Sequence, residues 1–276
     1  MSDHSKDNYK AEDERSAALN RLRSAASVTM DPELFEKLYL SPANQVKGDL
    51  RKTFGNPTPL AIAGFIVSST PLACDLMGWR GAGGSGAASI GGFYFLGGLL
   101  LFVGALFELL LGNTFSAVVF ATYGGFFFSF AATLTPAFAA FSTYAAEPLT
   151  APGQGLATTG FNASFGFWLL FMGIITLVYL VCSLRTNIAF VVLFISLTIC
   201  FELLAAAYFL NAADIVANAS SANKLVVGGG ACLFVTSLAG WWIFVALMLA
   251  AVDFPFQLPV GDLSSVIPGH SQRSAV

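Results

Sequence analysis

The chain has 276 residues, of which 56% are hydrophobic and only 11% are charged, and its mean hydropathy is +0.72. A soluble globule of this size could not cover so much apolar surface with polar groups, so the composition predicts a multi-pass membrane protein. The net charge is −3 and no basic cluster follows in the apolar part of the chain, which argues against nucleic acid as a partner.

Residues 1–54 are predicted to form a charged N-terminal tail. Nine Lys/Arg and nine Asp/Glu lie in the first 56 residues, and no apolar stretch precedes Asn56, so we expect no secretory signal. Within the tail, residues 31–39 have the pattern of a short capped helix with Leu34 and Leu38 on one face. This helix could dock on the membrane-side surface, or the tail could serve only trafficking or regulatory machinery.

The chain enters the bilayer at Asn56-Pro57-Thr58-Pro59. Asn56 can accept a hydrogen bond from a backbone N–H, and Pro57 suits the first turn because its missing N–H would have had no intrahelical partner. The prolines also leave Asn56 and nearby carbonyls free to face a solute. The stretch is therefore either a well-capped helix start or a start that also faces a solute.

Six apolar runs follow, each close to the roughly 20 residues that a helix needs to cross the hydrocarbon core. They lie at about 57–77, 89–111, 115–141, 162–184, 187–210 and 225–252. The sequence therefore predicts an all-α fold, with six transmembrane helices in one bundle over residues 55–254 and a C-terminal tail over 255–276. Only Arg80 and Lys224 would lie outside if the N-terminus is cytoplasmic, so the positive-inside rule predicts both termini in the cytoplasm.

Few ionisable residues lie inside the predicted spans, and these are Asp75, Glu108 and Glu202. A charge at the centre of a membrane helix costs about 3 kcal/mol on the insertion scale, so such a residue usually faces protein or a water-filled cavity. Glu202 is the most deeply placed. It is either a neutral structural residue bonded to a neighbouring helix or a participant in conduction or proton coupling.

The sequence offers little for catalysis. The only histidines are His4 and His270, both in the tails, and the four cysteines lie in apolar runs without CxxC spacing. We therefore expect no enzyme activity, no metal site and no cofactor. No Lys or Arg lies deep in a span, so an anion would have to bind helix N-termini and neutral donors, or cross as its undissociated acid.

Four motifs carry a family resemblance. They are Asn56-Pro57-Thr58-Pro59-Leu60, the run ELLLGNTF at 108–115, the run TYGGF at 122–126 and the turn LRTN at 184–187. In this order on six spans they resemble the acetate uptake transporter family, which includes fungal plasma-membrane acetate permeases and bacterial YaaH-type acetate/succinate carriers. The resemblance covers roughly residues 40–265, and the charged tail is similar to that of the fungal branch.

The resemblance implies uptake of acetate and related short monocarboxylates with protons across the plasma membrane. It also implies homo-oligomers, hexamers in the bacterial structures, with a pathway in each protomer. The family's aromatic and aliphatic constriction falls on Phe65, Tyr123 and Leu197, and the vestibule that binds the carboxylate falls on Asn56, Pro57, Thr58 and Pro59. A Phe and a Leu would exclude hydrated ions, whereas a Tyr hydroxyl could bond a passing carboxyl group.

Glu108 is expected to orient the inner end of the pathway. Two positions depart from the family pattern. Leu60-Ala61-Ile62 lacks a glycine that is more usual there, which could narrow or stiffen the start of the first span. Glu202 stands where the family has an apolar residue, which could alter proton coupling or substrate preference.

Two other functions remain open. The long tail would suit an acetate-responsive membrane sensor, and a pore narrow enough for acetic acid could also export ammonia or ammonium. Deletion of most of the tail separates sensor from carrier, because a carrier should keep its substrate flux.

Overall fold

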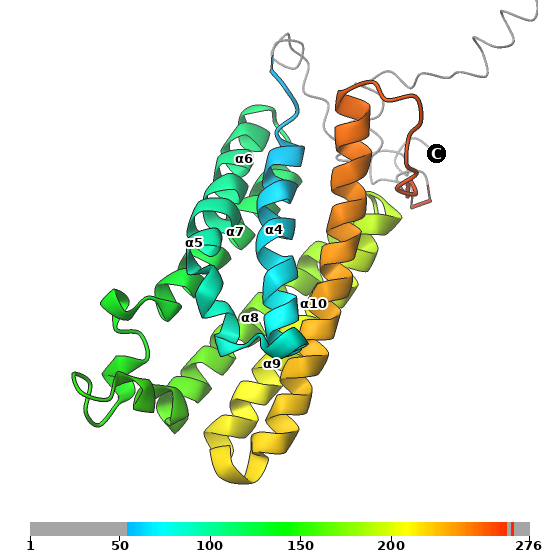
Figure 1. Ribbon diagram of the computed structural model, residues 1–276. Helices are drawn as coiled ribbons and strands as arrows, with labels where there is room; N and C mark the ends of the chain where they lie inside the picture. The colour runs from blue at the N-terminus through cyan, green and yellow to red at the C-terminus, as the bar shows by residue number, and fades with distance from the viewer. Residues whose placement is uncertain (1–53, 264–265, 268–276) are drawn as a thin grey trace, which may run out of the picture. The chain divides into compact units, whose positions relative to one another are not determined.

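The computed structural model describes residues 54–263 and 266–267, and the predicted helix at 31–39 lies outside this part of the chain (Figure 1). Across the described residues the fold is helical, with a single isolated β-bridge. The long helices are α4 (Thr58–Leu76), α6 (Leu99–Leu110), α7 (Thr114–Leu134), α8 (Thr159–Ser183), α9 (Ile188–Ala213) and α10 (Ile215–Ala251). The short α5 (Ile90–Gly92) and the π-helical turn η3 (Phe93–Gly98) lead into α6.

Six helical segments in this part of the chain are long and apolar enough to cross a membrane. The second is a composite that runs through η2 (Gly84–Ser89), α5, η3 and α6, and its bounds are Gly84–Leu110. The loops hold the short 3₁₀ turns η1 (Trp79–Gly81), η4 (Pro136–Phe138), η5 (Ser142–Tyr144) and η6 (Pro152–Ala157). The predicted all-α membrane fold with six spans is confirmed.

Two helix ends differ from the prediction, and each has a local cause. Helix α7 ends at Leu134 because Thr135 precedes a proline and has the extended backbone that this position favours. Helix α10 begins at Ile215, before the apolar run, because the Asp214 carboxylate accepts hydrogen bonds from the backbone N–H groups of Val216 and Ala217, both at 2.9 Å.

Helix α4 packs against α6 on one side and α10 on the other, while α9 packs against both α8 and α10 (Figure 1). Small residues allow the close approach of α4 and α6. A Cβ atom built on Gly104 would lie 2.7 Å from the Cβ of Ala61, and one on Gly64 would collide with the carbonyl oxygen of Leu96. Backbones in a membrane protein approach this closely where the side chains are minimal.

The segment after α10 turns back toward the first turn of α9, and we refer to residues 253–263 as the C-terminal strap (Figure 1). The Ile188 N–H donates to the Gly261 carbonyl at 2.8 Å, and Asn187 and Asp262 form an antiparallel bridge. The Trp242 indole N–H donates to the Pro259 carbonyl at 2.9 Å. These bonds tie the strap to the α8–α9 turn and to α10.

Candidate functional site

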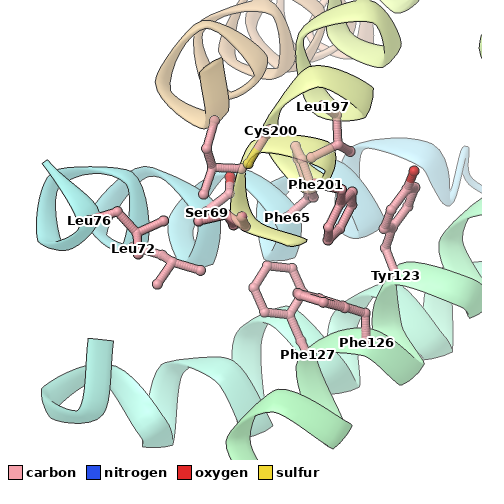
Figure 2. A pocket seen from close by; sticks show the side chains of 12 residues that line it. Phe65, Ser69, Leu72, Leu76, Tyr123, Phe126, Phe127, Leu197, Cys200 and Phe201 are labelled. Atoms are coloured by element: carbon pink, nitrogen blue, oxygen red, sulfur yellow. The ribbon is translucent and has the colours of Figure 1, made fainter. Parts of the chain in front are cut away.

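A small internal cavity lies where α4, α7, α9 and α10 meet (Figure 2). Its volume is about 40 Å³. A single water needs roughly 10–15 Å³ of such space, so the cavity has room for about three or four water-sized groups. Its walls are Phe65, Ser69, Leu72, Leu76, Tyr123, Phe126, Phe127, Leu197, Cys200, Phe201, Leu204 and Leu233.

The three residues expected at the constriction are brought together around this cavity. Phe65 is 8% exposed, Tyr123 is 4% exposed and Leu197 is 2% exposed. They come from three different helices, α4, α7 and α9, and all three side chains line the same space (Figure 2). Their function as a gate remains a prediction.

Sequence reasoning missed the other wall residues, although helical spacing marks them. Ser69 follows Phe65 by four positions on α4, and Phe201 follows Leu197 by four positions on α9. Residues spaced in this way lie on one face of a helix. A search for the i+3, i+4 and i+7 neighbours of each constriction residue would have found most of the cavity wall.

A second cavity, of about 30 Å³, lies beside the first. It is lined by Ile62, Phe65, Leu101, Val119, Phe120, Tyr123, Phe190, Leu193 and Phe194. Phe65 and Tyr123 are the residues common to both linings, and their ring centroids are 6.3 Å apart with a 55° tilt between the planes. The two rings therefore border both cavities.

Polar groups at the cavities are neutral hydroxyls. The Tyr123 hydroxyl lies 2.8 Å from the Thr176 hydroxyl of α8, and the Ser69 hydroxyl lies 2.9 Å from that of Ser237 on α10. The residues that line the two cavities include no charged side chain. A solute in either cavity would meet apolar walls, because no polar atom is exposed on the surface of either cavity.

A buried polar cluster joins the start of α4 to the end of α6 and the start of α7. Thr58 and Glu108 are each 0% exposed, and the Thr58 hydroxyl donates to one Glu108 carboxylate oxygen. The Asn113 side-chain amide donates to the other oxygen at 2.6 Å, and the Asn113 backbone N–H donates to the Glu108 carbonyl at 2.8 Å. The prediction for Glu108 named neither partner.

Helix α4 begins at Thr58 with Pro57 as its N-cap, one residue later than a cap at Asn56 would place it. The Asn56 side chain is exposed, and its carbonyl oxygen accepts a hydrogen bond from the Thr58 N–H at 2.9 Å. Pro57 is buried and Pro59 is half-buried. The stretch thus places Thr58 against Glu108, while its contact with a solute stays a prediction.

Glu202 lies away from both cavities. It is an exposed residue near the middle of α9, between Phe201, which lines the first cavity, and Leu203. Its carboxylate reaches α8 beside Gly173, where a Cβ atom would collide with it. A coupling function for Glu202 stays a prediction, since its side chain lines neither cavity.

A wider pocket opens at the far end of α4, with a volume of about 330 Å³. It is lined by Asp75, Leu76, Met77, Gly78, Ala82, Gly83, Gly84, Ser85, Asn223, Val226 and Val227, and we call it the Asp75 pocket. Leu76 also lines the first cavity. The Asp75 pocket, the two cavities and the Thr58–Glu108 cluster therefore follow one another along α4.

Comparison with known proteins identifies the family. Residues 40–265 match the GPR1/FUN34/yaaH family. Protein alcS of Aspergillus fumigatus is 49% identical over 86% of both chains. The acetate transporter protein patA of Penicillium expansum is 32% identical over 80% of this chain and 84% of its own, and acetate permease A of Emericella nidulans is 31% identical over 80% and 71%.

The bacterial acetate channel SatP shares the fold, with a TM-score of 0.58 and 23% identity over 75% of this chain and 99% of that chain. The family match covers most of the chain and includes all six spans. The protein is a multi-pass membrane protein that belongs to the GPR1/FUN34/yaaH family.

Proposed function

We propose that the protein moves acetate and related short monocarboxylates, together with protons, across the plasma membrane. In this proposal both termini are cytoplasmic, and the protein is a homo-oligomer with a pathway in each protomer. Support comes from the relatives named as acetate transporters and from the sequence of cavities along α4 inside a single chain.

The observation that carries the proposal is the pair of rings between two cavities. Phe65 and Tyr123 stand where the cavities meet, and the apolar walls around them would resist the passage of a hydrated ion. The space of about 40 Å³ suits a molecule with few heavy atoms such as acetic acid. Leu197 would narrow the first cavity from the α9 side.

The absence of charge on the cavity walls favours the undissociated acid as the species that crosses. A carboxylate would lose its hydration without gaining a cation, and burying an unpaired charge is far more costly than burying a hydrogen-bonded neutral group. The substrate would then carry its own proton, so the proton gradient would drive accumulation. Asn56, which is exposed, would meet the carboxyl group at the inner vestibule, while the buried Thr58 would support the vestibule through its hydrogen bond to Glu108.

The test is uptake of labelled acetate into proteoliposomes with an imposed pH gradient. Wild type is compared with Phe65→Ala, which widens the constriction, and with Phe171→Ala. Phe171 is a matched control because it is 64% exposed on α8 and lines neither cavity. We expect Phe65→Ala to raise the ratio of butyrate to acetate uptake severalfold, while Phe171→Ala keeps the wild-type ratio.

An unchanged ratio in Phe65→Ala would remove Phe65 from the constriction. If the wild type moves no acetate, transport of acetate is refuted. Release of ammonia from the same liposomes then tests the exporter alternative, because a narrow and uncharged path would also pass that molecule.

A further inference from the structure

The Asp75 pocket combines an acidic side chain with a wall residue that it shares with the first cavity. Asp75 is half-buried in the last turn of α4, and the next residue, Leu76, lines both this pocket and the first cavity. The facing wall is the α10 segment around Asn223, Val226 and Val227. Leu76 is therefore a wall residue of both spaces, and a solute that enters the first cavity from this end of α4 would pass close to Asp75.

The negative charge of Asp75 has no cation beside it on the pocket wall. Asp75 is the charged residue among those that line the pocket. The neighbouring basic residues, Arg80 on η1 and Lys224 on α10, are exposed and do not belong to the lining. Other wall positions are apolar side chains, glycines, Ser85 and the neutral amide of Asn223.

We infer that Asp75 is a specificity-determining residue, which adds a repulsion of the carboxylate anion at the entrance to the exclusion that the uncharged cavities impose, while the undissociated acid enters. This inference rests on the proposed function. For a like charge about 7 Å away, which suits a pocket of this size, Coulomb repulsion lowers the local anion concentration about threefold in water-like surroundings and about fiftyfold at an effective dielectric constant of 20. The neutral acid feels no such repulsion.

The experiment measures acetate anion flux in proteoliposomes that contain the full chain, at neutral pH, with an inside-positive potassium diffusion potential set by valinomycin. The potential drives the anion but not the acid. We expect potential-driven acetate uptake by Asp75→Asn to exceed that of the wild type at least threefold. Asp75→Glu keeps the charge and should behave as the wild type.

Glu147→Gln is the matched control, because Glu147 is an exposed carboxylate of the loop before η6 that bonds Thr150 and does not line the Asp75 pocket. It should match the wild type. Raising ionic strength screens exposed charges, so salt should increase anion uptake by the wild type and leave Asp75→Asn unchanged. Protein inserted in either direction reports the same effect, since every anion that crosses passes Asp75.

Anion uptake by Asp75→Asn that equals or falls below that of the wild type overturns the inference. An equal rise in Glu147→Gln overturns it as well, because the effect would then belong to general surface charge. If the wild type takes up no acetate under a pH gradient, the proposed function itself fails. If the wild type accumulates acetate normally and Asp75→Asn has the same potential-driven anion uptake as the wild type, the proposed transport stands. Only the selectivity assigned to Asp75 is then refuted.

Discussion

Replacing Thr58 with valine tests the buried cluster at the start of α4. Valine has nearly the same shape, so the change removes the hydroxyl and leaves one oxygen of the Glu108 carboxylate without its Thr58 donor. A hydrogen bond to a charged group contributes about 1.5–3 kcal/mol, and the loss falls on a site where both side chains are 0% exposed. At about 2–4 °C per kcal/mol for a domain of this size, the melting temperature should fall by about 3–12 °C.

The assay is thermal unfolding of the purified protein in detergent at a fixed heating rate. Thr198→Val is the matched control, since Thr198 is half-buried on α9 and its hydroxyl donates to the Phe194 carbonyl of its own helix at 2.8 Å. A second background, Glu108→Gln, replaces the carboxylate with a neutral amide. In that background Thr58→Val should cost only about 0.5–1.5 kcal/mol, the range for bonds between neutral groups.

Equal melting temperatures for Thr58→Val and Thr198→Val would refute the reasoning. The reasoning would also be refuted if Thr58→Val lowered the stability as much in the Glu108→Gln background as in the wild type. The loss would then not depend on the Glu108 carboxylate. The cycle thus measures the coupling of the two residues separately from the general cost of losing a hydroxyl.

Two further predictions concern the path and its surroundings. Ser69→Ala should lower the rate of acetate uptake severalfold at normal protein levels, because Ser69 lines the first cavity and the change removes the oxygen that accepts a hydrogen bond from Ser237 of α10. Ser196→Ala, whose buried hydroxyl pairs with Thr236 outside the cavity, should not, and equal rates in the two variants would exclude Ser69 from the path. Glu202→Gln should accumulate acetate along a pH gradient as the wild type does, since Glu202 is exposed and lines neither cavity. Equilibration without accumulation in that variant would instead place Glu202 in the coupling path.

Much of the fold follows from the sequence because the bilayer imposes one length and one composition on every span. The six apolar runs predicted the six long helical segments. The Asn187 side chain caps α9 by accepting a hydrogen bond from the Phe190 N–H at 2.9 Å. Hydropathy alone missed the early start of α10. It indicates which residues can lie in lipid, whereas the helix begins where its first backbone hydrogen bonds form.

The site was harder to predict because its partners are distant in the chain. Thr58 and Glu108 are separated by 50 positions, and their contact depends on how closely α4 approaches α6 at Gly104. No pattern in one run of sequence encodes that pairing. The constriction residues came from family resemblance, while the position of Glu202 outside the cavity required the rotation of α9 to be known.

The length of α10 has a practical consequence for finding which side of the membrane each end faces. Its 37 residues span about 55 Å, and even at a 40° tilt they would cover about 42 Å along the bilayer normal, against a hydrocarbon thickness of about 30 Å. At least one end of α10 therefore extends beyond the hydrocarbon, and the α9–α10 hairpin, where Val216 is 84% exposed, is the end that carries the charged residues Asp214 and Lys224. A short epitope inserted there would remain far from the cavities, so antibody labelling of intact cells could report topology in a protein that still transports.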